Sequence, residues 1–198
     1  MSDILTSAKA YEKLLDIEYQ FILGRKSKQV RFSVFFDEYQ FYHLAGLQYL
    51  TDRATLLYGD RKKLFNLILE KQIKEAQISS SDFYPQIKDR IEYLEYLESI
   101  FDSNKTVFKY NSQTHAFSAI KSDFLLKNEV NFRNVFTFLS EDKTRKQYFC
   151  RSFFPQIDKD YSLGQTNWTL LYKKKIQKST KEEIILYDKL KKIRNLRQ

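Results

Sequence analysis

The chain has 198 residues, of which 42% are hydrophobic and 30% charged, a balance typical of a globular protein with a buried core. A single cysteine, Cys150, and two histidines exclude an intrachain disulfide framework and a Cys/His zinc cluster, and neither a G-x-G-x-x-G nor a Walker loop is present. The net charge of +9 is uneven, since residues 140–198 carry +8 and residues 1–139 carry +1, which favours a polyanionic partner such as nucleic acid or an acidic protein.

The first half of the chain predicts helices around one hairpin. Apolar residues at helical spacing predict a helix over residues 3–18, and the alternating segments YQFILG and QVRFSVFF predict a hairpin with Gly24 at its turn. A helix over residues 37–50 is expected to begin with Asp37 as its N-cap. Two further amphipathic helices are expected over residues 60–76 and from about 79 to 102.

After residue 103 the hydrophobic period changes from helical spacing to two. The segments TVFKY, AFSAIKSDFLLK, FRNVFTFL, KQYFCRSFF and WTLLYKKKI predict an antiparallel meander, and a basic helix is expected over residues 180–196. The prediction is an α+β fold with an N-terminal helix and hairpin, central helices, a C-terminal curved antiparallel sheet of about four to five strands and a closing basic helix. We expect one domain, residues 1–198, with a helical insert at about 60–103.

The N-terminal sequence and the hydropathy predict where in the cell the protein is found. The N-terminus lacks the positive-then-apolar pattern of a signal peptide. No apolar run reaches the roughly 20 residues that cross a bilayer. The expectation is a cytoplasmic protein with no membrane contact.

The segment FYHLAGLQYL, residues 41–50, contains one of the two histidines and one of the four glycines. His43 falls on the apolar stripe of the expected helix, so it is either a packed core residue or a general acid or base, because an unperturbed imidazole has a pKa near ~6.5. Gly46 is either a close-packing position or a place where a substrate or strand approaches the helix backbone. His115 lies between two predicted strands, as an exposed turn residue or a functional group over a cationic sheet face.

Polar residues interrupt the predicted strands. A concave sheet that gathers them on one face is suited to a phosphodiester, because cations stabilise the charge on a phosphorane while a hydroxyl or an imidazole moves protons. A solvated sheet face displays the same residue types, so both interpretations stay open. The residues concerned are Lys121, Ser122, Arg133, Arg151, Ser152, Thr166, Asn167, Tyr172 and Lys173.

The order of several segments resembles the phage-associated Barnase–EndoU–Colicin–RelE-like nuclease family, in particular its branch with a helical insert between a histidine-bearing helix and the sheet. The resemblance covers most of residues 8–176. It is carried by AKAYEKLLDIEYQFILGRKSKQVRFSVFF, FYHLAGLQYL, AIKSDFLL, VFTFL and RSFFPQIDKDYSLGQTNWTLLYKKKI. It implies a small metal-independent nuclease, usually an RNase, without a cofactor, from phage, mobile-element or toxin contexts.

The resemblance also implies which residues form the site. His43 matches the family's histidine helix, and Lys121 matches the polar position ahead of a hydrophobic strand. Ser152 matches the serine of the S-F-F-P segment, and Lys173 matches the lysine that ends the last strand. These four are the candidate catalytic residues. The candidate substrate-binding residues are Arg151, Thr166, Tyr172, His115 and Arg133.

The combined hypothesis is endonucleolytic RNA cleavage through a 2′,3′-cyclic phosphate. His43 would take the 2′-OH proton, the strand cations would stabilise the phosphorane, and Ser152 or Tyr172 would orient the phosphate or protonate the leaving oxygen. The expected partners are RNA and an acidic antitoxin or inhibitor protein. The alternative is a non-catalytic module that binds nucleic acid or a protein through a basic C-terminal face, with salt-sensitive binding but no new RNA ends.

Overall fold

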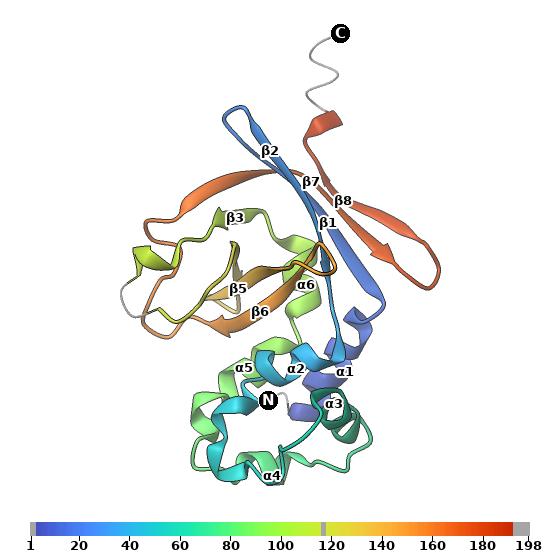
Figure 1. Cartoon of the computed structure of the whole chain (residues 1–198), viewed down its shortest axis with the longest axis vertical. Coiled ribbons are helices and arrows are strands. Elements are labelled where there is room, and N and C mark those ends of the chain that lie inside the picture. Colours follow the sequence, from blue (N-terminus) through green and yellow to red (C-terminus); the bar gives the residue numbers. More distant parts are fainter. Residues whose placement is uncertain (1–2, 116–117, 192–198) are drawn as a thin grey trace.

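A closed barrel of seven strands, with an eighth strand added at its outside, forms the centre of the molecule, and helices pack at one end of it (Figure 1). The computed structural model describes residues 3–115 and 118–191. The strands are β1 (Ile17–Arg25), β2 (Lys28–Phe35), β3 (Thr106–Lys109), β4 (Phe124–Val130), β5 (Arg133–Asp142), β6 (Gln147–Pro155), β7 (Thr166–Gln177) and β8 (Glu183–Asp188). The helices are α1 (Ile4–Leu14), α2 (Glu38–Leu44), α3 (Arg61–Leu69), α4 (Glu75–Ser79), α5 (Lys88–Leu94) and α6 (Leu97–Ser103).

The order of the strands explains how the barrel closes. Neighbours run β1-β2-β6-β5-β4-β3-β7, and β7 then pairs with β1 along most of its length. These pairs are antiparallel except for β2 with β6, which run parallel at Val34–Tyr148 and Phe35–Phe149. Among the described strands, β8 pairs with β7 alone.

The predicted sheet of about four to five strands is therefore wrong. The segments after residue 103 do form strands β3 to β7, but the N-terminal hairpin belongs to the same sheet. Strand β1 pairs with β7 and β2 pairs with β6, across more than a hundred residues of chain. Hydrophobic period identifies a strand but not its distant partner, so the closure was not visible in the sequence.

The predicted basic helix over residues 180–196 is also wrong. Residues 183–188 form β8, which begins after a turn where Lys181 has a φ of 63°. The run EIILYD is rich in residues that favour strands, and its Ile184 and Ile185 are exposed. Residues 192–196 of the predicted helix lie outside the described part of the chain.

The central helices are shorter than their hydrophobic pattern predicts. Asp37 is confirmed as the N-cap of α2, since its carboxylate accepts a hydrogen bond from the Tyr39 amide. Helix α2 ends at Leu44 because Gly46 adopts a φ of 81°, which a helix does not continue. The hairpin turn falls at Lys26, where φ is 53°, and Gly24 lies within β1. Within residues 3–115 and 118–191, no helix has both the length and the apolar character for crossing a membrane.

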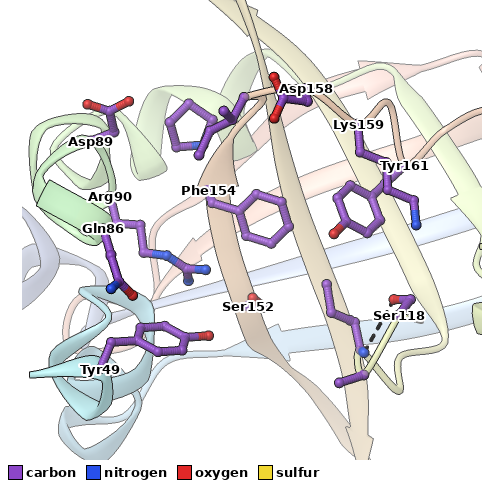
Figure 2. A pocket seen from close by; sticks show the side chains of 14 residues that line it. Tyr49, Gln86, Asp89, Arg90, Ser118, Ser152, Phe154, Asp158, Lys159 and Tyr161 are labelled. Carbon is purple, nitrogen blue, oxygen red and sulfur yellow. Dashed lines mark hydrogen bonds between the residues drawn. The ribbon is translucent and has the colours of Figure 1, made fainter. Parts of the chain in front are cut away.

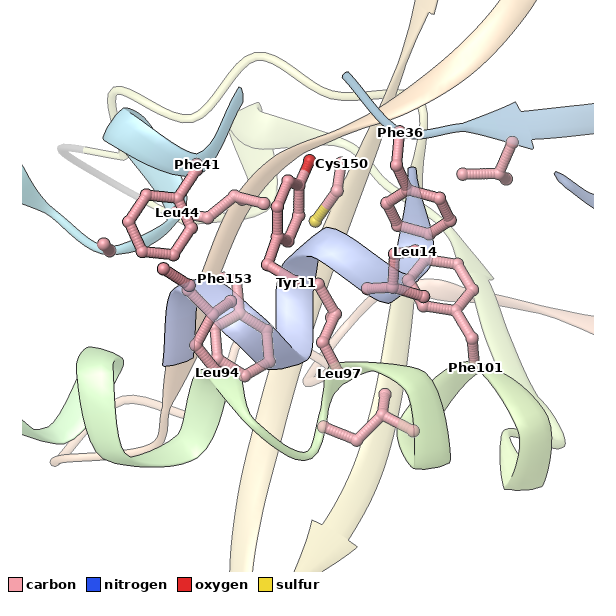
Figure 3. Packing of buried hydrophobic residues seen from close by; sticks show 14 of the residues in the cluster. Tyr11, Leu14, Phe36, Phe41, Leu44, Leu94, Leu97, Phe101, Cys150 and Phe153 are labelled. Atoms are coloured by element: carbon pink, nitrogen blue, oxygen red, sulfur yellow. The ribbon is translucent and has the colours of Figure 1, made fainter. Parts of the chain in front are cut away.

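One hydrophobic cluster joins the helices to the barrel (Figure 3). Tyr11 of α1 packs edge-on to Phe36 and Phe65, and Phe101 of α6 stacks on Tyr19 of β1 with ring centroids 5.0 Å apart. Strand β6 contributes Cys150 and Phe153 to the same cluster. The outer face of β6 is thereby held at a fixed position relative to α2, α3 and α5.

Candidate functional site

A β-bulge in β6 places Arg151 at the surface. Phe138 of β5 pairs with Ser152 and Leu139 pairs with Cys150, so Arg151 is the extra residue between them. A bulged residue leaves the regular alternation of the strand and re-aims its side chain. Arg151 is exposed and lines two adjacent concavities, one shared with His43 and the other with Lys121.

The concavity that contains His43 is here called the histidine pocket. It measures about 290 Å³. Three of the pocket's residues come from one face of α2. Arg61 is the first residue of α3, and the remaining residues belong to β6. Among the residues that the structure describes, no aspartate or glutamate lines it. The lining residues are Tyr39, Gln40, His43, Arg61, Phe149, Cys150 and Arg151.

The surroundings of His43 favour its neutral form. Burial lowers the pKa of His43 below its ordinary value of 6.5, and the positive charges of Arg61 and Arg151 lower it further, while the nearby Gln48 side chain acts in the opposite direction. The half-buried ring is therefore neutral at pH 7 and is able to accept a proton. Tyr42 contacts the ring edge-on, with centroids 5.5 Å apart.

The two arginines of the histidine pocket carry unneutralised charge. Neither Arg61 nor Arg151 forms an ion pair with a carboxylate of residues 3–115 or 118–191. Asp37, the N-cap of α2, is bound by Lys62 at 3.0 Å and by Arg145 at 3.2 Å, and Asp60, the N-cap of α3, accepts hydrogen bonds from the amides of Lys62 and Lys63. Two free guanidiniums beside a neutral imidazole suit an anion such as a phosphodiester.

The second concavity lies across Arg151 and is called the lysine pocket. It measures about 470 Å³, and Lys121 and Arg151 line it together. Ser140 of β5 fixes the segment beside it, since its hydroxyl donates to the Lys121 carbonyl at 3.1 Å. The carboxylate in this pocket, Asp123, is paired with Lys109 at 3.4 Å. Lys121 therefore lies next to the histidine pocket without entering it.

The third concavity is called the aromatic pocket, and it holds Ser152 (Figure 2). It measures about 430 Å³ and lies at the side of β6 that Ser152 and Phe154 face. Arg90 of α5 and Tyr161 complete its wall. Because Ser152 follows Arg151 directly in β6, this pocket and the histidine pocket meet at one strand.

The structure does not bring Lys173 together with the other three candidate catalytic residues. Its side chain is 1% exposed and lies opposite Phe21 of β1. The ammonium donates hydrogen bonds to the carbonyls of Phe101, Asp102 and Asn104 at 2.5, 2.8 and 2.8 Å. Burial lowers the pKa of Lys173 to about 8. In this position the lysine caps the C-terminal end of α6.

The remaining substrate-binding candidates lie outside the histidine pocket. Arg133 donates to Asp89 of α5 and to the Gln156 carbonyl, both at 2.7 Å. His115 Nε2 lies 2.9 Å from the Tyr161 carbonyl. On β7, Thr166 pairs with Lys109, and Tyr172 is opposite β1 and β8.

Sequence reasoning missed two residues of the histidine pocket. Tyr39 sits four residues before His43, so the shared helix face was a usable signal. Arg61 had no such signal, because it reaches His43 only through the packing of α3 on α2. Its guanidinium lies over the Tyr42 ring, 5.3 Å from the centroid.

Side chains that could coordinate a metal ion do not cluster in the described part of the chain. Among residues 3–115 and 118–191, no group of three or more His, Cys, Asp or Glu side chains is arranged to hold a metal ion. Cys150 lines the histidine pocket but is only 2% exposed, and burial raises the pKa of its thiol. The groups available for chemistry in this pocket are therefore an imidazole, a phenol and two guanidiniums.

The barrel thus carries a pocket in which a neutral imidazole lies beside two arginines that have no ion-pair partner among the described residues. The family model described as phage-Barnase-EndoU-ColicinE5/D-RelE like nuclease4 matches residues 3–190, so the chain belongs to this family of phage-associated nucleases. The resemblance inferred from the sequence is thereby confirmed, and membership supports a nuclease function. Searches of curated proteins and of solved structures found no match.

Proposed function

We propose that the chain is an endoribonuclease that cleaves RNA in the histidine pocket by general acid–base chemistry without a metal ion. One observation carries the proposal: a neutral His43 lies with two unpaired arginines in a pocket that no carboxylate lines. A carboxylate there would repel a phosphodiester, whereas the guanidiniums attract one and the imidazole is ready to take a proton.

In the proposed reaction, His43 removes the proton of the ribose 2′-OH. The 2′ oxygen attacks the adjacent phosphorus, and Arg61 and Arg151 stabilise the negative charge of the phosphorane. The bond to the 5′ oxygen then breaks, and Tyr39, the hydroxyl in the same pocket, donates its own proton to the leaving oxygen. The imidazolium then loses a proton to water and the tyrosinate takes one up, which restores both groups. The products are a 2′,3′-cyclic phosphate and a 5′-OH end. Lys121 binds a neighbouring phosphate in the lysine pocket.

The test is end mapping on RNA incubated with the purified chain, with and without EDTA. We expect 2′,3′-cyclic phosphate ends in both reactions. A matched oligonucleotide with one 2′-deoxyribose at the scissile position should stay intact there, because the attacking oxygen is missing. Cleavage of the deoxy position, or activity that EDTA abolishes, would contradict the mechanism.

The same experiment tests the non-catalytic alternative. A module that only binds nucleic acid, or an acidic partner protein, would retain RNA in a salt-dependent manner but create no new ends. Recovery of intact RNA under all conditions, with binding that weakens as salt rises, would favour this alternative.

The arginines of the histidine pocket should set the pH dependence of cleavage. Arg61→Gln and Arg151→Gln remove positive charges that lower the pKa of His43, so the acidic limb of kcat/KM should move to higher pH. Each should also lower kcat by about 10- to 1,000-fold, since it stabilises the phosphorane. The matched control is Lys63→Gln, an exposed cation two residues after Arg61 that lines none of the three pockets. An unchanged pH profile in both arginine variants would refute this assignment.

Cys150 should be dispensable for cleavage. Burial holds its pKa well above the ordinary range, so little thiolate is available as a nucleophile at neutral pH. Cys150→Ala is expected to keep kcat/KM within about threefold in the RNA assay, with a loss of unfolding free energy of roughly 1–2 kcal/mol from the buried cavity. Loss of cleavage in a folded Cys150→Ala protein would instead indicate thiol chemistry.

A further inference from the structure

The aromatic pocket contains a cation that the cleavage chemistry does not use. Arg90 of α5 lies between two rings, with its guanidinium 5.2 Å from the Tyr49 centroid and 5.0 Å from the Phe154 centroid. It donates to the Phe153 carbonyl at 3.2 Å, and none of the described carboxylates pairs with it. A guanidinium has five N–H donors, so several remain for a ligand.

The other walls of the aromatic pocket present ring surfaces. Phe154 stacks on Phe138 with centroids 5.5 Å apart, and Tyr161 meets Phe154 edge-on at 5.4 Å. Figure 2 shows the Arg90 guanidinium directed toward the space between Phe154 and Tyr49. A planar, unstacked nucleobase binds to surfaces of this kind by stacking on rings and on guanidinium planes.

The acidic residues of the aromatic pocket favour a base over a phosphate as its ligand. Asp89 is neutralised by Arg133 at 2.7 Å, and Lys159, the second cation of the pocket, lies over the Tyr161 ring, 5.2 Å from the centroid. Asp158 is exposed at the rim and forms no ion pair with a described residue. A phosphate would meet the Asp158 charge, whereas a neutral base offers N–H groups to it. The histidine pocket has no carboxylate, so the two pockets differ in the part of a nucleotide that they suit.

The pairing of donors and acceptors selects among the bases. Arg90 presents only donors, and guanine presents two acceptors, O6 and N7, on one edge, which is the usual bidentate partner of arginine. Guanine also carries N–H donors that a carboxylate such as Asp158 accepts. Adenine places an amino donor where O6 would be, against the guanidinium.

The aromatic pocket is joined to the catalytic groups at two points. Ser152, in its wall, follows Arg151 in β6. Gly46, three residues after His43, packs directly on α5, where a Cβ would lie 2.8 Å from Ile87 Cγ2 and 3.0 Å from Arg90 Cδ. The missing side chain of Gly46 therefore allows the end of α2, the helix of His43, to pack closely against Arg90.

We propose that the aromatic pocket binds a guanine base of the RNA, next to the nucleotide cleaved in the histidine pocket, through Arg90 and stacking on Phe154 and Tyr49. This assignment rests on the proposed ribonuclease function. It makes the enzyme selective for guanosine at one fixed position relative to the cleaved bond.

The test combines cleavage mapping on a random-sequence RNA with calorimetric binding of the four nucleoside monophosphates. Arg90→Met removes the donors. Ala119→Phe fills the pocket from an exposed position and leaves the core contacts in place. The control is Lys88→Met, on the same helix but outside the pocket. Wild type and the control should show guanosine enrichment and bind GMP about 10-fold more tightly than AMP, CMP or UMP, and both pocket variants should lose this difference.

The two parts of the test separate the two proposals. Selective GMP binding that survives His43→Ala and is lost in Ala119→Phe supports the guanine site even if no RNA is cleaved, an outcome that would refute the ribonuclease function. RNA cleavage without base preference, unchanged in Ala119→Phe, would overturn the guanine site and leave the ribonuclease intact. Equal binding of inorganic phosphate and GMP, or a preference for AMP, would also overturn it.

Discussion

Substitution of His43 by alanine is expected to lower kcat/KM for RNA cleavage by about 100- to 10,000-fold, the usual contribution of a general base. The fold should survive, because the ring is only half-buried and the helix is held by the apolar residues Phe41 and Leu44. Circular dichroism and urea unfolding check the fold, and initial rates on a defined RNA check the activity.

The pH dependence sharpens this expectation. A base must be neutral to act, and burial together with Arg61 and Arg151 lowers the pKa of His43 below 6.5. Wild-type kcat/KM should therefore rise with pH through this lowered pKa and be close to its plateau at pH 7. The rising limb should be absent from any residual activity of His43→Ala.

The second histidine supplies the control. His115 is engaged with the Tyr161 carbonyl and lies outside the histidine pocket, so His115→Ala should keep the acidic limb of the profile and change kcat/KM only a few-fold. A folded His43→Ala protein with wild-type turnover would show that His43 is not the general base. Loss of the acidic limb of the pH profile in His115→Ala instead would lead to the same conclusion.

Replacement of Lys173 by methionine is expected to have the largest effect on stability. The variant keeps a similar length but leaves the buried carbonyls of Phe101, Asp102 and Asn104 without their donor. At about 1–3 kcal/mol for each unsatisfied buried group, with partial relaxation, the loss of unfolding free energy should be roughly 3–5 kcal/mol. Urea denaturation, monitored by fluorescence, measures it.

The next lysine in the same strand is the matched control. Lys174 forms an ion pair with Glu183 of β8 at 2.7 Å, and Glu183 is exposed. Lys174→Met should therefore cost at most about 1 kcal/mol. If Lys173→Met were as stable as wild type and yet unable to cleave RNA, the structural role of Lys173 would be refuted. The catalytic role that the family resemblance implies would then be supported.

The contrast between Lys173 and His43 shows what a sequence predicts about a site. His43 could be located in advance, because helical period and the Asp37 cap place it on one face of a short helix. Lys173 stands in a run of three lysines, KKK, which is typical of a solvated strand. Its burial depends on carbonyls at the end of α6, about 70 residues earlier in the chain. The sequence around Lys173 does not indicate hydrogen-bond partners at such a distance.

The same limit applies to the fold and to the rest of the histidine pocket. Period-two segments predicted strands β3 to β7, because alternation is a local property. The barrel closure, the bulge at Arg151 and the approach of Arg61 to His43 all depend on segments distant in sequence. These features gather the positive charge around the imidazole, so the electrostatics of the site followed from tertiary packing.

The pairing of β1 with β7 has a consequence for the synthesis of the protein. All residues that line the histidine pocket lie between Tyr39 and Arg151, so they leave the ribosome before β7, which begins at Thr166. The barrel stays open until β7 is available to join β1, a contact of long sequence separation that forms late and slowly. The histidine pocket is therefore expected to reach its final geometry only after Thr166–Gln177 has been synthesised, although every residue that lines it precedes this strand.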